Sequence, residues 1–548
     1  PNPNPNPNAD HSIEYGLNIG RHSLEEALEA AKQGPKGLIK ANISRNTITT
    51  LREFLKENDY LVKPADKNLG LIILPKQWYI DEGIRQLSDT STYKVVHTVE
   101  YIDKLHQLAD YRKEFISYWL TRSNDVNKLL TGKRGLTKFL KYPLIADIIL
   151  PAFHHLPKVH KTPLKGRPIV PSYAWITSNL SRYIDSLLQP LVRSYSWILR
   201  DSKHLLRELA KLQLPLHEEI WLITADIQSM YTNLPTTEGI DIMNWLGREH
   251  YQSKDIGNFI GEATSFVLEN NYLSFQDQVY HQTDGTAMGT SMAPTYANLF
   301  VAAFEDQFKI PYLDNLLYYG RYIDDVLAIV HGSKEKALKV VEHLNALHPK
   351  LQFDAEISDR AIPFLDIHLY LRKDTVTPGK VTLHTKVYQK PLNAYQYIPW
   401  SSYHPESVKL AFIKGELTRY IRISSSYSDY LRVAQLFWKR LRRRGYPVRW
   451  LRRAFKMVTY HSQRAVSVVD RAKGDTTRSP LVYHIEYNPV WDFVNGSKVL
   501  THTVKHWKPH YHKLIGTKSN RIMRAVHRCR NLSDYMNTWN KELLAHKG

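Results

Sequence analysis

Apolar and polar positions follow two different periods along the chain, and the alternation predicts interleaved strands and helices. An apolar run ends at Asp226, and the segment 317–330 has the pattern of a β-hairpin. The helical period predicts helices at 237–247, 255–269 and 334–347, and another after Ala293. Strands are expected at 351–357 and 364–372. The middle of the chain is therefore expected to be α+β with an antiparallel sheet.

The flanking regions have a different pattern. Residues 11–145 are expected to be mainly helical, with two short strands and a Gly/Asn turn at 61–74. A second strand-like pair includes His160–Val170, and a helix is predicted from Ser178 to about Leu188, ahead of Pro190. From about residue 405 the chain is expected to be helical again.

The net charge of the chain indicates the class of its binding partner. The 548 residues include 74 Lys and Arg against 53 Asp and Glu, a formal net charge of +21. Such an excess indicates a polyanionic partner, and nucleic acid is the first candidate. Aromatic residues lie within the densest basic run, 439–453, which suits a surface that binds phosphates and stacks bases. A solvated helix face or a localisation signal is the alternative.

The cysteine content and the hydropathy of the chain indicate the cellular compartment that we expect. The single cysteine, Cys529, excludes an intrachain disulfide and argues against a cysteine-based zinc site, as expected of a reducing intracellular protein. No apolar run reaches the ~18 residues of a membrane span, so we expect neither a transmembrane helix nor a membrane partner. The opening repeat PNPNPNPN suggests a flexible tail over residues 1–10, without a signal peptide.

Three aspartates carry the candidate chemistry. Asp226 ends an apolar strand, and Asp324 with Asp325 interrupts an apolar hairpin. Adjacent buried carboxylates are unfavourable unless cations compensate them. Nucleotidyl transfer needs carboxylates on a rigid floor to hold two Mg²⁺ ions, with Mn²⁺ as the alternative ion. We therefore predict that these three residues are metal-binding and catalytic.

Two further segments accompany the aspartates. Tyr231 follows Asp226 closely, where an aromatic ring could exclude a 2′-hydroxyl, although ordinary packing is its alternative role. A glycine-containing loop runs from Gly285 to Gly289 and becomes helical after Pro294. Glycine allows the backbone to approach a base pair closely.

The order of these segments resembles the A, B and C motifs of reverse transcriptases. More narrowly, the chain resembles the reverse transcriptases of Penelope-like retroelements, relatives of telomerase reverse transcriptase. The resemblance extends over roughly residues 60–535. It rests on Lys63-Pro-Ala-Asp-Lys67, His155-Leu-Pro-Lys-Val-His-Lys161, Gly166-Arg-Pro-Ile-Val170, Tyr322-Ile-Asp-Asp325, Phe353 with Pro363-Phe-Leu-Asp366, Tyr388-Gln-Lys-Pro391 and Ser402-Tyr-His-Pro405.

The resemblance implies a right-hand polymerase that copies RNA into DNA. Its expected parts are a tail at 1–10, a helical extension and the start of the fingers at 11–145, fingers and palm at 146–375, a thumb at 376–475 and a C-terminal region at 476–548. The palm sheet would be antiparallel and the C-terminal region helical and basic. The partners implied are template RNA, a DNA primer or target and dNTPs, with an element-encoded structured RNA as a further candidate, and the location is nuclear.

The resemblance also assigns roles to individual residues. The incoming nucleotide would contact Lys158, Lys161, Arg167, Tyr231, Gly289 and Pro294. Primer and template would contact Phe364, Leu365, Asp366, Arg442, Arg443 and Arg444. The alternative role of Lys158, Lys161 and Arg167 is general contact with RNA phosphates. The alternative role of Phe364 and Leu365 is packing in the core.

The chain departs from the family at two points. Met288-Gly289 and Ala293-Pro294 stand where many reverse transcriptases have Gln-Gly and Ser-Pro, which concerns nucleotide selection rather than the metals. No GIY-YIG endonuclease pattern follows, so we expect a truncated chain or a member that lacks this domain. Three other functions remain open: an RNA-dependent RNA polymerase, a catalytically inactive RNA-binding scaffold, and a domesticated host enzyme with the same chemistry.

Overall fold

The computed structural model describes residues 44–132, 147–402, 404–460, 481–486, 522–527 and 532–545, with four isolated helical positions before residue 44. The chain forms two compact units. One comprises Pro1–Asn58, Gln396–Arg422 and Leu431–Trp539, and the other comprises Asp59–Tyr395, Ile423–Tyr430 and Asn540–Gly548. We call them the helical unit and the sheet unit.

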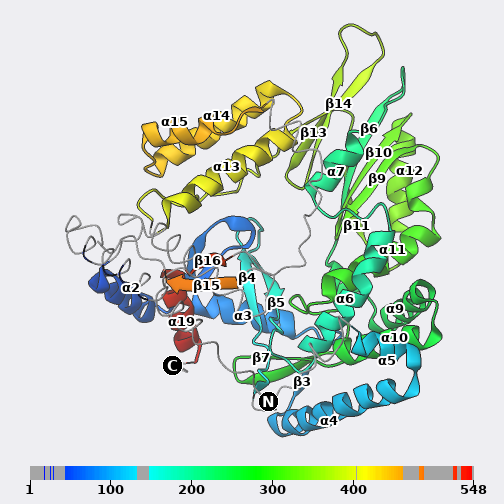
Figure 1. Cartoon of the computed structure of the whole chain (residues 1–548). Helices are drawn as coiled ribbons and strands as arrows, with labels where there is room; N and C mark the ends of the chain where they lie inside the picture. The colour runs from blue at the N-terminus through cyan, green and yellow to red at the C-terminus, as the bar shows by residue number, and fades with distance from the viewer. Residues whose placement is uncertain are drawn as a thin grey trace. The chain divides into compact units, whose positions relative to one another are not determined.

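A four-stranded antiparallel sheet organises the sheet unit (Figure 1). Its strands are ordered β11 (Phe353–Ser358), β6 (Ile220–Ile227), β10 (Asp325–His331) and β9 (Leu316–Tyr322). Side chains alternate between the two faces of each strand. On β6, Ile223 and Ala225 join one hydrophobic core, whereas Ile220 and Leu222 join another. The sheet is therefore buried on both faces, which explains the continuous apolar run ahead of Asp226.

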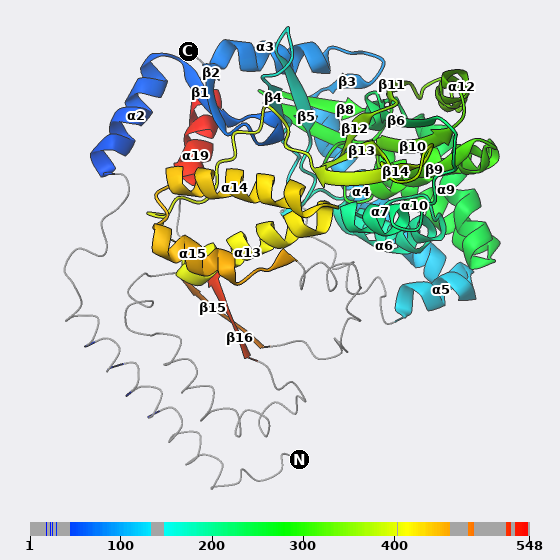
Figure 2. The same ribbon diagram turned by 90° about the horizontal axis from the view of Figure 1, so that it is seen from above.

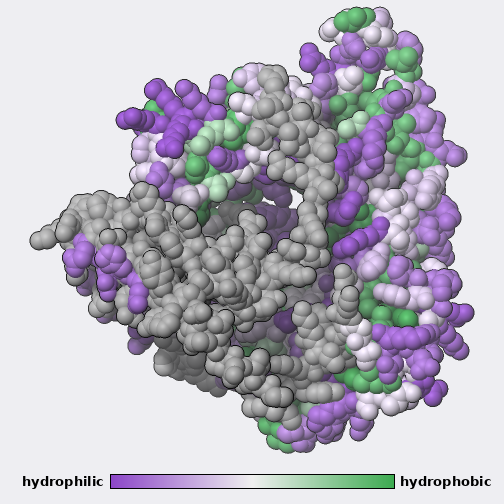
Figure 3. Space-filling view, viewed as in Figure 1, coloured by the Kyte–Doolittle hydropathy of each residue, from purple (hydrophilic) through white to green (hydrophobic). Residues whose placement is uncertain are grey.

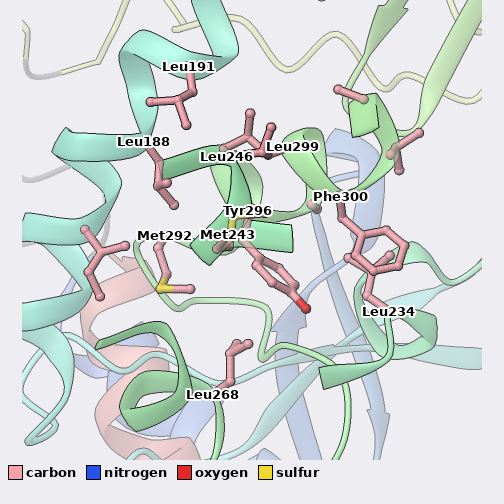
Figure 4. Close-up of a cluster of buried hydrophobic side chains, with 14 of the residues drawn as sticks. Leu188, Leu191, Leu234, Met243, Leu246, Leu268, Met292, Tyr296, Leu299 and Phe300 are labelled. Atoms are coloured by element: carbon pink, nitrogen blue, oxygen red, sulfur yellow. The ribbon is translucent and has the colours of Figure 1, made fainter. Parts of the chain in front are cut away.

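Helices pack together in the larger of these two cores. The layer contains α6 (Ser178–Ser194), α9 (Thr236–Tyr251), α10 (Lys254–Leu268) and α11 (Ala293–Gln307), with α12 (Lys334–Asn345) against the sheet. Figure 4 shows leucines, methionines and aromatic rings from several of these helices interlocking around Tyr296. This helical layer supports the sheet from one side.

Smaller sheets and helices complete the sheet unit. The three-stranded sheets are β12 (Ala361–Phe364), β13 (Ile367–Lys373) and β14 (Val381–Val387), and β3 (Tyr93–Val96), β8 (Gln278–Gln282) and β7 (Asn271–Phe275). The two-stranded sheets are β1 (Tyr60–Pro64) with β2 (Leu71–Pro75), and β4 (His154–Lys158) with β5 (Lys165–Ile169). The remaining helical segments are η1 (Asp66–Asn68), α3 (Lys76–Leu87), α4 (Thr98–Arg122), α5 (Asn124–Thr131), α7 (Ser202–Leu209), α8 (Met230–Asn233) and η4 (Ile310–Tyr312).

The helical unit contains most of the basic C-terminal half. Its described elements are α2 (Arg45–Glu57), most of α13 (Glu406–Ile423) and α14 (Tyr427–Arg443), α15 (Val448–Lys456), and the parallel strands β15 (Leu481–Glu486) and β16 (Ile522–His527). Figure 2 shows α13, α14 and α15 next to one another. A last helix, α19 (Leu532–Ala545), begins in the helical unit and ends in the sheet unit. Within the described ranges, no helix has the length and apolar character that a membrane crossing requires.

These elements confirm the α+β class, the antiparallel sheet and the helical C-terminal region. One local expectation was wrong. Helix α6 continues through Pro190 to Ser194, because the burial of Leu187, Leu188 and Leu191 offsets the hydrogen bond that proline cannot donate. The C-terminal region also contains the strands β15 and β16, whose pairing is not local. The predicted tail and Cys529 lie outside the described residues.

Candidate active site

The register of the sheet brings two of the three predicted aspartates together. Asp325, the first residue of β10, pairs directly with Asp226 near the end of β6. Directly paired residues project from the same face of a sheet. Both aspartates continue the rows of Leu222 and Leu327, which are buried on that face. The apolar part of each strand therefore anchors a carboxylate at its end.

The third aspartate lies in the turn that joins β9 to β10. Because Tyr322 pairs with Asp325, the turn consists of Ile323 and Asp324 alone. The amide of Ile227 donates to the carbonyl of Asp324 over 3.0 Å, which ties the turn to β6. Ile323 has a φ of 57°, an unfavourable conformation for a β-branched residue. Such strain persists only where the surroundings enforce it.

A buried ion pair supports this turn. The guanidinium of Arg321 donates to Glu305 over 2.6 and 2.9 Å, and both side chains are inaccessible to solvent. Tyr319 and Trp197 also donate to Glu305, over 2.5 and 2.8 Å. Arg321 Nη1 donates to the carbonyl of Ile323 over 2.8 Å. The pair thus fixes the strained residue immediately before Asp324.

Negative charge accumulates at this end of the sheet. Desolvation raises the pKa of Asp226, and the charges of Asp324 and Asp354 raise it further. Desolvation also raises the pKa of Asp325 to about 6, again with contributions from Asp324 and Asp226. Mutual repulsion of this kind is relieved when a cation binds.

The oxygen donors suit a divalent ion, although they do not enclose one. Within the described ranges, no group of three or more His, Cys, Asp or Glu side chains is arranged to hold a metal by itself. Mg²⁺ is commonly held by one or two carboxylates, with substrate phosphates and water as its other ligands. Asp226 and Asp324 fit this mode, because each is a hard oxygen donor and Asp324 raises the pKa of Asp226.

The predicted fingers cations lie on one hairpin. Lys158 ends β4, Lys161 follows in the turn, and Arg167 lies on β5 opposite Leu156. The guanidinium of Arg167 donates to both carboxylate oxygens of Asp66, over 3.1 and 3.2 Å. The charge of Arg167 also lowers the pKa of Asp226. Of the three hairpin cations, Arg167 is therefore electrostatically coupled to Asp226.

Tyr231 belongs to the short helix α8, close to the aspartates. Burial raises its pKa to about 12, and the negative charge of Asp324 contributes. The carbonyl of Tyr231 accepts from the amide of Thr286 over 2.8 Å, which joins this turn to the glycine-containing loop. Gly285 has a φ of 72° there, and an added Cβ would lie 2.9 Å from the backbone of Tyr231 and Thr232.

Gly289 and Pro294 have local structural roles. An added Cβ at Gly289 would lie 2.2 Å from the carbonyl oxygen of Val170, and its φ is 134°. Pro294 occupies the first turn of α11, where its missing amide hydrogen carries no penalty. The loop therefore packs against the end of the β4–β5 hairpin, and the predicted contact of these residues with a nucleotide stays a prediction.

The predicted primer segment forms the β12–β13 turn. Phe364 is 3% exposed and lies in the core, whereas Leu365 has a φ of 55°. Asp366 accepts from the hydroxyl of Ser202 over 2.5 Å. Phe364 is therefore a core residue, while Leu365 and Asp366 form a tight turn.

The basic residues 442–444 lie in the helical unit. Arg442 and Arg443 are exposed at the end of α14, and Gly445, with a φ of 85°, ends the helix. A cavity of about 460 Å³ is lined by Arg449, Arg452, Arg453 and Lys456 of the next helix, α15, and by Met457, which follows it. Figure 3 shows hydrophilic side chains gathered over α14 and α15 at its upper left.

Sequence reasoning missed three charged residues near the aspartates. Asp354 on β11 pairs with Asp226 from the other side. The charges of Lys67 and Lys390 lower the pKa of Asp325. Asp354 could have been found from its place on a predicted strand, but its partner depends on sheet order. Lys67 and Lys390 belong to motifs that carried the resemblance, without an assigned role.

The chain was compared with protein-family profiles, curated proteins and solved structures. The profile of the animal helix-turn-helix domain matches residues 396–456. A comparison with curated proteins gives no match. Among solved structures, telomerase from Candida albicans, in complex with a TWJ fragment of telomeric RNA, is 10% identical with a TM-score of 0.49; the alignment covers 84% of this chain and 71% of that chain.

Two other structures are similar at the same level of identity. Apo telomerase from Candida tropicalis is 9% identical with a TM-score of 0.42, and the alignment covers 89% of this chain and 73% of that one. The BmCPV RNA-dependent RNA polymerase at the elongation state is 9% identical with a TM-score of 0.34. That alignment covers 65% of this chain and 33% of the polymerase.

Proposed function

We propose that the chain is an RNA-directed DNA polymerase of the Penelope-like type, which extends a primer 3′-hydroxyl on an RNA template. One observation carries the proposal. The pairing of β6 with β10 places Asp226 opposite Asp325, with Asp324 in the adjoining two-residue turn. Carboxylates on a rigid antiparallel floor are what two-metal nucleotidyl transfer requires.

Each part of the site has a distinct task in this proposal. Asp226 and Asp324 would hold two Mg²⁺ ions, or Mn²⁺, and Asp325 would complete the site. Bound ions lower the pKa of the attacking hydroxyl and neutralise the leaving pyrophosphate. Lys158, Lys161 and Arg167 would hold the triphosphate of a dNTP, since bidentate Arg and point-charge Lys suit phosphates.

Selectivity for deoxynucleotides is assigned to Tyr231. Its side chain is half-buried against the larger core, and the charge of Asp324 contributes to its raised pKa, so the residue lies near the candidate metal site. A ring in this position would clash with a 2′-hydroxyl. This argument favours dNTPs over NTPs and thus a reverse transcriptase over an RNA polymerase.

The remaining assignments belong to the same proposal. Residues 146–375 would form fingers and palm, and 376–475 the thumb, with template RNA and primer bound by the turn 364–366 and by Arg442, Arg443 and Arg444. The exposed arginines at the end of α14 suit phosphate contacts. A retroelement enzyme that copies RNA onto DNA would act in the nucleus.

Primer extension tests the proposal directly. The full chain is given an RNA template, a DNA primer and Mg²⁺, with dNTPs or NTPs. Asp324→Ala is the site variant, and Asp241→Ala, which changes an exposed residue of α9, is the matched control. We expect extension with dNTPs in the wild type and in Asp241→Ala, and its loss in Asp324→Ala.

Three other results would contradict the proposal or one of its parts. Extension with NTPs alone would overturn the role of Tyr231 and indicate an RNA polymerase. Tight RNA binding without extension from either nucleotide would indicate a scaffold that has lost catalysis. Extension that survives Asp324→Ala would remove the metal assignment.

A further inference from the structure

Helix α9 begins without a cap from the residue that precedes it. Its N-cap residue is Pro235, which makes no side-chain hydrogen bond to the helix, and its first amide belongs to Thr236. The first amides of a helix have no partner within the helix. Thr236 is 8% exposed, so this end of α9 is buried. A partner for the amide of Thr236 must therefore come from elsewhere in the chain.

That partner is Asp284, which lies 48 residues from Thr236 in the glycine-containing loop. Its carboxylate oxygen Oδ1 accepts from the amide and from the hydroxyl of Thr236, over 3.0 Å in each case. The same oxygen accepts from the amide of Gly285 over 3.0 Å. A carboxylate at a helix N-terminus is also favoured by the helix dipole. Asp284 thus caps α9 and orders the start of the loop.

Asp284 is itself held by the strand that precedes it. Gln282, the last residue of β8, is 2% exposed, and its Nε2 donates to the carbonyl of Asp284 over 3.0 Å. This hydrogen bond fixes the direction in which the loop leaves β8. The carboxylate of Asp284 therefore meets Thr236 from a defined position.

A second contact joins the same loop to Tyr231. The amide of Thr286 donates to the carbonyl of Tyr231 over 2.8 Å. Between the two contacts, the loop backbone lies so close that a Cβ added to Gly285 would be 2.9 Å from the backbone of Tyr231. Residues 231–236 are thus attached at both ends to residues 284–286. We call the contacts Asp284–Thr236 and Thr286–Tyr231 the clasp.

We propose that Asp284 is a positioning residue for nucleotide selection, which holds the backbone of Tyr231 where its ring excludes a 2′-hydroxyl. The inference rests on the proposed function, in which Tyr231 selects dNTPs, and it adds a residue that acts through Tyr231. A ring that discriminates by one hydroxyl group must be placed to within about 0.5 Å. The single hydrogen bond to its carbonyl leaves the segment free to turn about that bond, whereas attachment at both ends does not.

The alternative is that Asp284 serves stability alone. The two roles differ in one measurable quantity, the ratio of kcat/KM for dNTP to that for NTP. A loss of folded enzyme lowers both values by the same factor and leaves the ratio unchanged. A displaced ring lowers the ratio, because it hinders ribonucleotides less.

The test is single-nucleotide primer extension by the full chain, with a graded series of variants. Asp284→Ala removes all three hydrogen bonds of the carboxylate, and Thr236→Val removes only the one from the hydroxyl. Asp284→Asn keeps an acceptor oxygen, and asparagine caps helices as well as aspartate does. The matched control is Asp374→Ala, because Asp374 also accepts from two backbone amides, those of Val376 and Thr377, but in the β13–β14 loop. Hydrogen exchange of the peptides around residues 236 and 286 is measured without nucleotide.

We expect the ratio to fall about tenfold in Asp284→Ala, as for the loss of a hydrogen bond to a charged group, and by a smaller factor in Thr236→Val. Asp284→Asn and Asp374→Ala should keep the wild-type ratio to within about twofold. Exchange at the amides of Thr236 and Thr286 should be faster in Asp284→Ala and unchanged in Asp374→Ala.

Two outcomes would overturn the inference. If the ratio in Asp284→Ala equals that in Asp374→Ala, Asp284 has a structural role alone. If exchange at Thr236 and Thr286 is unchanged in Asp284→Ala, the clasp does not hold the segment of Tyr231. Should Asp284→Ala fail to fold, the ratio in Thr236→Val decides in the same way. A wild type that extends neither nucleotide would refute the polymerase, while faster exchange in Asp284→Ala would still support the clasp.

Discussion

Arg321 and Ile323 are joined by a hydrogen bond of 2.8 Å from the guanidinium of the first to the carbonyl of the second. Ile323 is the strained residue of the turn that presents Asp324, and Arg321 is itself paired with the buried Glu305. A β-branched residue adopts a positive φ only when other contacts stabilise it. The buried pair therefore acts on the geometry of the candidate metal site.

Arg321→Met should be strongly destabilising, because it leaves the buried carboxylate of Glu305 without its cation. We expect a loss of about 3–5 kcal/mol in the free energy of unfolding, measured by urea denaturation of the full chain. Arg321→Met combined with Glu305→Leu should lose less than the sum of the single changes. Additive losses would show that the two residues are not coupled.

Tyr231→Val should relax discrimination between nucleotides while the aspartates stay intact. Removing the ring opens space for a 2′-hydroxyl, and we expect the ratio of kcat/KM for dNTP to that for NTP to fall roughly 10–100-fold. The ratio is measured by single-nucleotide primer extension. Tyr173→Val is the control, since Tyr173 is 66% exposed. An unchanged ratio in Tyr231→Val would leave only a packing role for this ring.

Gly289→Ala should destabilise the sheet unit. The added Cβ would lie 2.2 Å from the carbonyl oxygen of Val170, and alanine disfavours a φ of 134°. We expect a loss above about 1 kcal/mol and a lower melting temperature of the full chain. Gly415→Ala is the opposite case, because Gly415 lies within α13 with nothing within 4 Å of an added Cβ.

Gly415→Ala should be neutral or stabilising by up to about 1 kcal/mol, through its higher helix propensity. Similar melting temperatures for the two alanine variants would contradict the close contact of Gly289 with Val170.

His155 should make stability depend on pH. Burial lowers its pKa to about 4, although the hydrogen bond to the carbonyl of Tyr79 opposes this shift. Since the unfolded chain binds the proton near pH 6.5, its contribution to stability is complete above that pH and is lost as pH falls toward 4. The maximal loss is about 3 kcal/mol.

Urea denaturation at pH 7.5 and pH 5 measures this dependence. His155→Leu should lose less stability between the two pH values than the wild type does. His250→Leu, which changes an exposed histidine, is the control. An equal pH dependence in all three proteins would show that His155 is protonated in the folded chain.

Local pattern was sufficient for the elements that carry the aspartates. The apolar run before Asp226 and the hairpin around Asp324 and Asp325 were both predicted, and both form. A strand buried on both faces and a tight hairpin are each encoded by neighbouring residues. The β1–β2 and β4–β5 strand pairs could be predicted for the same reason. The roles of the predicted site residues stay predictions, because their position alone does not test their chemistry.

Sequence by itself thus determined which segments are strands and helices near the site, and which residue types end them. Only the tertiary structure decided that Asp354 lies opposite Asp226, that Lys67 acts on both aspartates, and that α6 continues through Pro190. Residues far apart in the chain meet through the order of strands in a sheet, through ion pairs such as Asp66–Arg167 and through the burial of whole helix faces. Their free energy comes from contacts that no local period encodes.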